Sequence, residues 1–161
     1  MNSNLAAASN AFGFDLFQQL RRQEADKNAF FSPLSVTVAL AMTYNGAVGE
    51  TKNAMAGALK IEGMRHADLN RASAELLKAL KSSDPKIELA IANSLWARGG
   101  LRFNEDFLAR NRQFYGAEIS ALDFDNPQPV VTINTRSSRA GLADLLLQPL
   151  HGVLRHRSVI A

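Results

Sequence analysis

The side chains that most often do chemistry in proteins are sparse in this chain and fall into no catalytic pattern. There is no cysteine, which excludes disulfides and thiolate chemistry. The three histidines, His66, His151 and His156, lack the spacing with a carboxylate that a metal site would need. Ser32 precedes a proline and does not lie in a Gly-x-Ser-x-Gly turn, so it is not presented as a nucleophile. We therefore predict no catalytic residue, no metal site and no cofactor, and the chain is not expected to be an enzyme.

The excess of positive charge is confined to the end of the chain. Residues 1–135 carry equal numbers of basic and acidic residues, and residues 136–161 account for the whole net charge of +3. That basic end contains no aromatic residue on which a base could stack, so we expect no nucleic-acid partner. No apolar run approaches the roughly 20 residues that span a bilayer, so we expect no membrane partner either. The first ten residues have neither the basic nor the apolar region of a secretory signal.

The elements that would position any functional residue are a mixture of helices and strands. Apolar periods of about 3.6 residues predict helices, and alternation with a period of two predicts strands. The predicted elements are a first amphipathic helix carrying Phe12, Leu16, Phe17 and Leu20, a short buried strand at Phe30-Phe31, helices over residues 32–44, 50–60 and 67–81, a strand over 87–96, a helix capped by Asn104, and a strand over 117–124. This order predicts an α+β fold in a single domain.

The segment from Asn28 to Thr51 is the most apolar part of the chain. Ser32 is a favourable N-cap, and Pro33 occupies the first helical position, where its missing N–H costs nothing. Asn45-Gly46 is suited to a left-handed turn that ends a helix. Between these residues the apolar side chains fall on every side, which predicts a helix that is buried all round.

Four motifs occur in order along the chain. They are NAFGFDLF at residues 10–17, FFSPLS at 30–35 followed by ALAM at 39–42 and GAVGET at 46–51, LAIANSLW at 89–96, and YGAEI at 115–119 followed by LDF at 122–124. Together they resemble the serpins, a family of protease inhibitors that trap their targets by inserting a loop into a sheet. The resemblance implies a partial serpin fold, with the N-terminal helices and two strands of the main sheet. It also implies a serine-type endopeptidase inhibitor acting by insertion of a reactive loop, and therefore a serine protease as partner of the full-length family.

The resemblance assigns roles to two groups of residues. Ser32 and Ser35 match the shutter of the family, where the main sheet opens, and their role would be conformational; they also fit a plain helix cap. In some serpins the helix that corresponds to residues 67–81 binds sulfated polysaccharide, which makes Arg71, Lys78 and Lys81 candidates for binding a polyanion. Asp68 and Glu75 lie among these cations, so an exposed helix face of mixed charge is favoured.

The end of the chain departs from the family pattern. Ile133-Asn134-Thr135 begins as expected, but Arg136-Ser137-Ser138 follows where the family has Trp-Val. We therefore interpret residues 1–161 as a single truncated serpin domain without its C-terminal half, and residues 125–161 as a divergent or poorly ordered end. The reactive loop and the strands that receive it would follow residue 161.

From this interpretation we expect that the chain alone inhibits no protease. The strand over 87–96 would have an open edge, and a complementary chain at that edge is a possible partner. Without such a chain we expect marginal stability and aggregation. The alternatives are a noninhibitory interaction protein and a nonfunctional product of a truncated gene. The family is most often extracellular, although the lack of a signal peptide leaves a cytoplasmic location open.

Overall fold

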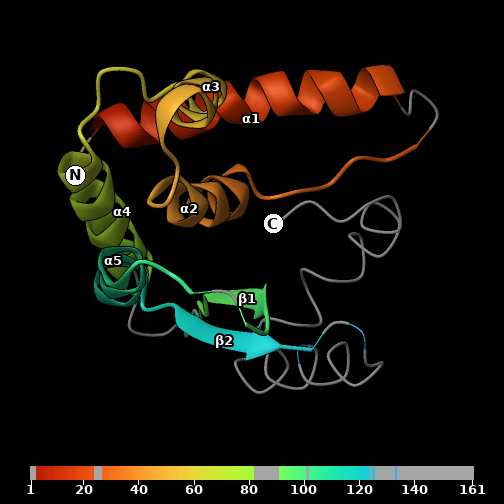
Figure 1. The fold of residues 1–161 in the computed structure, drawn as a ribbon. Helices are drawn as coiled ribbons and strands as arrows, with labels where there is room; N and C mark the ends of the chain where they lie inside the picture. Colours follow the sequence, from red (N-terminus) through yellow and green to blue (C-terminus); the bar gives the residue numbers. More distant parts are fainter. Residues whose placement is uncertain are drawn as a thin grey trace.

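The computed structural model describes residues 3–23, 27–81, 91–100 and 102–123, together with Asp125 and Ile133. These residues form five α-helices and a pair of β-strands (Figure 1). In chain order they are α1 (Ser3–Gln23), α2 (Pro33–Tyr44), α3 (Gly49–Leu59), α4 (His66–Lys81), β1 (Ser94–Arg98), α5 (Glu105–Tyr115) and β2 (Glu118–Leu122). The predicted α+β class is confirmed, and the described part is richer in helix than in strand.

The α2 helix begins where its sequence predicts. The Ser32 hydroxyl accepts a hydrogen bond from the Ser35 backbone N–H at 3.2 Å, and Pro33 is the first helical residue. The predicted left-handed turn at the end of α2 is wrong, because Asn45 has right-handed dihedral angles (φ −59°, ψ −23°). Gly46 serves a close approach instead, since a Cβ there would lie 3.1 Å from the Phe107 ring.

The burial of α2 is one-sided among the described residues. Val38, Ala41, Met42 and Tyr44 are buried, with Thr37 beside them. Leu34, Val36 and Leu40 are only half-buried, and Ala39 is exposed. Among the described residues α2 is therefore buried on one face only, whereas its sequence predicts a helix that is buried all round.

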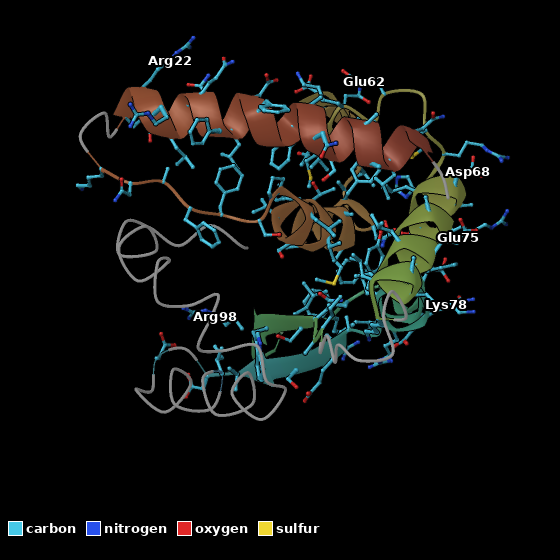
Figure 2. The ribbon with its side chains drawn as sticks, turned by 180° about the vertical axis from the view of Figure 1, so that it is seen from behind. Arg22, Glu62, Asp68, Glu75, Lys78 and Arg98 are labelled. Carbon is cyan, nitrogen blue, oxygen red and sulfur yellow. The ribbon has the colours of Figure 1, made fainter. Side chains whose placement is uncertain are left out.

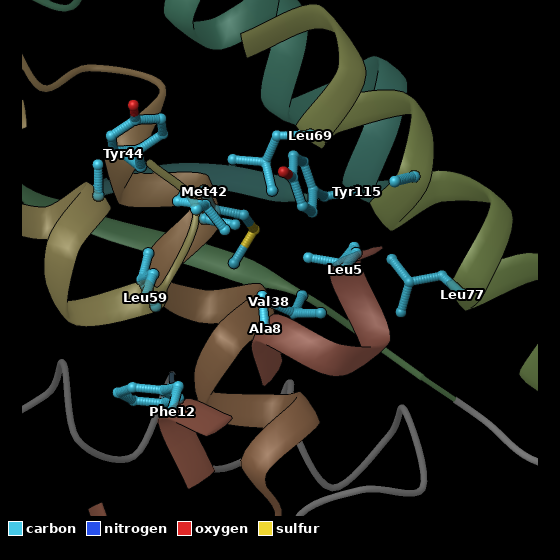
Figure 3. Close-up of a cluster of buried hydrophobic side chains, with 14 of the residues drawn as sticks. Leu5, Ala8, Phe12, Val38, Met42, Tyr44, Leu59, Leu69, Leu77 and Tyr115 are labelled. Carbon is cyan, nitrogen blue, oxygen red and sulfur yellow. The ribbon is translucent and has the colours of Figure 1, made fainter. Parts of the chain in front are cut away.

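The helices enclose one apolar core. α1 runs along one side with α3 and α2 packed against it, and α4 and α5 pack together near the N-terminal end of α1 (Figure 1). The side chains that fill the core come from all five helices and from the segments beside them (Figure 3). Among the largest are Leu5, Phe12, Met42, Leu59, Leu69, Leu77 and Tyr115.

The sheet consists of two parallel strands connected through α5. Ser94 of β1 lies opposite Glu118 of β2, and the register continues to Arg98 opposite Leu122. The predicted strand over 87–96 is found as β1, displaced toward the C-terminus; residues 82–90 lie outside the described part. The predicted strand over 117–124 is confirmed as β2. Each strand therefore has one edge that faces no other strand among the described residues.

One predicted element is wrong. Phe30-Phe31 does not form a buried strand, because residues 28–32 have no regular structure and the Phe30 side chain is 76% exposed. No described strand runs beside this segment to pair with it. The segment is an extended connection between α1 and α2.

Candidate functional site

The two serines at the start of α2 form a hydroxyl pair. The Ser35 hydroxyl donates to Ser32 Oγ at 3.0 Å, in addition to the bond from the Ser35 backbone. Ser32 is half-buried and Ser35 is exposed. Neither hydroxyl has a hydrogen bond to a histidine or a carboxylate in the part of the chain that the structure describes. The geometry is that of a helix cap, and it offers no base that could activate a nucleophile.

Helix α1 holds this end of α2 in place through a close backbone approach. A Cβ on Gly13 would lie 2.6 Å from Pro33 Cβ, so only glycine fits this crossing of the helices. One turn further along, the buried hydroxyls of Ser9 and Thr37 are 3.0 Å apart and hydrogen-bonded. The position of the Ser32–Ser35 pair is therefore fixed by contacts between α1 and α2 as well as by the cap itself.

The opposite end of α2 enters a network of buried amides that joins three helices. Asn70 Nδ2 of α4 donates to Asn45 Oδ1 at 2.9 Å, and Asn45 Nδ2 donates to Asn111 Oδ1 of α5 at 3.2 Å. The Tyr115 hydroxyl donates to Asn70 Oδ1 at 2.8 Å and lies 3.4 Å from Ser73 Oγ. Asn70 and Asn111 are 1% and 0% exposed, so water does not replace these bonds. We call Asn45, Asn70, Asn111 and Tyr115 the amide network.

The amide network continues to the sheet through Asn93. Asn93 Nδ2 donates to the Tyr115 carbonyl at 2.8 Å, and the Asn93 carbonyl accepts from the Glu118 N–H at 2.9 Å at the start of β2. Burial raises the pKa of Tyr115 to about 12, an effect that the nearby Ser73 hydroxyl opposes. Tyr115 is therefore a neutral donor at any physiological pH. Hydrogen bonds thus connect the end of α2 to both strands.

Sequence reasoning missed the amide network. One signal was available: Asn70 and Ser73 lie at the spacing of the apolar face that Leu69 and Leu77 define on α4. A polar residue at a core position needs a buried partner, so this pattern predicts a polar contact there. The partners could not have been named, because Asn45 and Asn111 are 66 residues apart in the chain.

The outer face of α4 carries the three residues that were candidates for binding a polyanion. Arg71, Lys78 and Lys81 are all exposed, and the 3.6-residue period puts Arg71 and Lys78 on one face. The same face presents Asp68 and Glu75, which project outward with Lys78 (Figure 2).

Asp68 is already paired within this face. Its carboxylate accepts from Arg65 Nε at 2.6 Å and from the same guanidinium at 2.9 Å. The Arg65 hydrogen bond lowers the pKa of Asp68, and the charges of Arg65 and Arg71 act in the same direction. The arrangement is that of an exposed face with alternating charges, and the polyanion assignment remains a prediction.

The described residues hold no cluster that would bind a metal. No group of three His, Cys, Asp or Glu side chains comes together in this part of the chain. Of the three histidines of the chain, His66 begins α4, whereas His151 and His156 lie outside the described residues. No described helix is long and apolar enough to cross a bilayer.

Comparison with known proteins identifies the family. The model of the serpin (serine protease inhibitor) family matches residues 7–141, which include all the helices and strands described above except the first four residues of α1. The chain therefore belongs to the serpin family, as the four motifs indicated.

Three relatives illustrate the similarity. The chain is 34% identical over 123 residues to the leukocyte elastase inhibitor of Xenopus tropicalis, covering 75% of this chain and 32% of the relative. It is 36% identical over 123 residues to the plasma serine protease inhibitor of Bos taurus, covering 74% and 30%. It is 34% identical over 149 residues to the corticosteroid-binding globulin of Oryctolagus cuniculus, covering 89% and 39%. The chain spans about a third of the length of these relatives.

Proposed function

We propose that this chain supplies the N-terminal scaffold of a serpin-type inhibitor of serine proteases. The observation that carries the proposal is the extent of the family match, which includes α2 with its serine pair and both strands. Two relatives that share this region are named as inhibitors, a leukocyte elastase inhibitor and a plasma serine protease inhibitor. By resemblance, β1 and β2 are strands of the sheet into which a cleaved reactive loop inserts, a mechanism for which serpins are themselves the standard example.

We further propose that residues 1–161 by themselves inhibit no protease. In the mechanism that the family implies, the loop offered to the protease lies near the C-terminus, and the strands that receive it follow the region matched here. The chain spans about a third of the relatives' length, which supports this division. Without the loop there is no peptide bond for the protease to attack and no insertion to trap it.

The role that we propose for Ser32 and Ser35 is conformational. The pair starts the helix that α1 holds at Gly13, and the other end of that helix leads through the amide network to the strands. A movement of the strands would therefore be transmitted to α2, and the serine pair would keep the first turn of α2 intact while it moves. No chemical step is assigned to either hydroxyl.

The proposal is tested by measuring whether a complex with a protease forms and survives SDS. The chain alone is incubated with trypsin, chymotrypsin or elastase, and we expect no SDS-resistant complex with any of them. In a second arm, residues 7–123 of this chain replace the aligned segment of the Xenopus leukocyte elastase inhibitor, and the unmodified relative is the control. We expect the chimaera to form the SDS-resistant complex with elastase. A complex with the isolated chain would overturn the second proposal, and a folded chimaera that elastase merely cleaves would overturn the first.

A noninhibitory binding protein is the second candidate, and one relative favours it. The chain aligns over 149 residues with a protein named for binding corticosteroid, so the matched region is also present in a binding protein. The edge of β1 that faces no other described strand would then receive a complementary chain. A natural partner that docks at this edge would favour this candidate, and removal of the basic residues 136–161 would show whether that end contributes. We infer an extracellular location from the relative named for plasma, with a cytoplasmic one as the alternative.

A further inference from the structure

His66 lies at the contact between α4 and the end of α2. It is the first residue of α4, and its ring packs at 4.6 Å, centroid to centroid, against the buried ring of Tyr44 at the end of α2. Its Nε2 atom is enclosed and has no hydrogen-bond partner among the described residues. An imidazole nitrogen in this position is easier to accommodate in its neutral form, because a charged N–H without an acceptor loses its hydration and gains nothing.

The charges that face His66 oppose a positive ring. Lys52 of α3 and Arg110 of α5 are the cations close enough to act on it, and the helix dipole of α4 also presents its positive end there. Two carboxylates on these helices are already paired: Asp68 on α4 binds Arg65, and Asp106 on α5 lies 3.5 Å from Arg110. Tyr44 of α2 contributes no charge below its own raised pKa.

The pKa of His66 agrees with this geometry. Burial lowers it from the ordinary value of 6.5, and the charges of Lys52 and Arg110 lower it further. The folded chain therefore holds His66 neutral in a range where the unfolded chain binds a proton. Such a group contributes stability above about pH 6.5, and that contribution is lost as the pH falls toward the pKa of the folded state.

His66 is also one helical turn from the amide network. Positions 66 and 70 lie on the same face of α4, so the turn that His66 begins carries Asn70. Asn70 bonds to both Asn45 and Tyr115, and the carbonyl of Tyr115 is bonded to Asn93 beside the strands. If the first turn of α4 opens, Asn70 can no longer hold these partners together.

We propose that His66 is an acid-sensitive switch: its protonation releases the first turn of α4 from the end of α2, and thereby loosens the amide network that supports β1 and β2. The proposal concerns the conformation of this chain and does not depend on whether the chain inhibits a protease. It predicts that acid acts on the strands through the helices, at a site distant from the Ser32–Ser35 pair.

The titration of the histidines in the full chain is the direct test. The ring Cε1–H signals of the three histidines are followed by NMR from about pH 7.5 to about pH 5, and His66→Gln identifies the His66 signal. We expect the pKa of His66 to lie below 6.5. A value of 6.5 or above would overturn the proposal, because the folded chain would then bind the proton as readily as the unfolded one.

Unfolding measurements test the link to the strands. Trp96 is the only tryptophan and lies in β1, so its fluorescence reports on the sheet, while far-UV circular dichroism reports on the helices. Between about pH 7.5 and about pH 5.5 we expect the urea midpoint of the wild type to fall in both signals. In His66→Gln and in His66→Phe, which keeps an aromatic ring against Tyr44, we expect that fall to be less than half as large.

His151→Gln is the matched control, and its urea midpoint should fall as much as that of the wild type. If the midpoints of both His66 variants also fall as much as that of the wild type, the proposal is overturned. It is also overturned if acid lowers the midpoint measured by circular dichroism but leaves the midpoint measured by Trp96 fluorescence unchanged. If one variant does not fold, the other variant and the NMR titration decide the question.

Discussion

The hydroxyl of Tyr115 provides the sharpest test of the amide network. It donates to Asn70 Oδ1 at 2.8 Å, and the two side chains are 4% and 1% exposed. The change Tyr115→Phe removes this donor and keeps the ring that fills the core beside Leu69 (Figure 3). The substitution therefore probes one hydrogen bond with little change in apolar packing.

The expected effect follows from the acceptor that is left behind. No other donor is bonded to Asn70 Oδ1 among the described residues, and water has no access at 1% exposure. A buried polar atom that loses its partner costs about 1–3 kcal/mol, whereas the loss of the ring itself, which would cost more, is avoided. With a urea dependence of about 1–3 kcal/mol per molar, the unfolding midpoint should fall by on the order of 1 M.

The assay is urea unfolding near pH 7, followed by the fluorescence of Trp96 and by circular dichroism. Tyr44→Phe is the matched control, because Tyr44 is also buried and its hydroxyl has no hydrogen bond to a described residue. We expect the control to change the free energy of unfolding by less than about 0.5 kcal/mol. If Tyr115→Phe is as mild as Tyr44→Phe, the amide network contributes no specific stability and the reasoning fails.

Two further predictions concern the helices on either side of the core. Gly13→Ala should destabilise the fold by about 1–3 kcal/mol, because the new Cβ would lie 2.6 Å from the proline that begins α2. Gly57→Ala, inside α3, should stabilise the fold by about 0.5–1 kcal/mol, because the new Cβ would meet only one carboxylate oxygen, at 3.4 Å. Urea midpoints that shift in the same direction for both glycines would contradict this account of the packing. The double variant Arg71→Ala/Lys78→Ala should change retention on an immobilised sulfated polysaccharide very little, because acidic residues share that face of α4. Retention that is strong in the wild type and lost in the variant would establish the polyanion site.

The parts of the fold that the sequence predicted are those with local determinants. Ser32 and Pro33 specify the start of α2 through contacts within three residues, and Asn104 does the same for α5 by accepting from the Asp106 N–H at 2.8 Å. Asn45-Gly46 was misread for the opposite reason. The glycine there accommodates the ring of Phe107, about 60 residues away in the chain, and no local pattern contains that information.

The same distinction applies to the candidate site. The serine pair could be identified because its two members are three residues apart and lie in a motif. The bond between Tyr115 and Asn70 joins residues 45 positions apart, and periodicity indicates only that each occupies a buried face. Phe30 shows the same limit for burial, since its apolar character predicted a core position while its exposure depends on which strands lie beside it.

The amide network also accounts for the way the helices keep one arrangement although large apolar side chains stay outside the core. Phe14 and Phe30 are 70% and 76% exposed, and burying either of them would be worth about 1.5–3 kcal/mol. Apolar contact has no direction, so by itself it would favour rearrangements that cover these rings. Any rearrangement that separates α4 from α5 or from the end of α2 leaves buried amides unpaired, at about 1–3 kcal/mol for each polar atom. Because the two effects are of similar size for a single ring and a single amide, the several bonds of the network together outweigh the gain from one phenylalanine. The network therefore selects the arrangement of the helices. The loss of one bond through Tyr115→Phe should lower the free-energy difference between that arrangement and its alternatives.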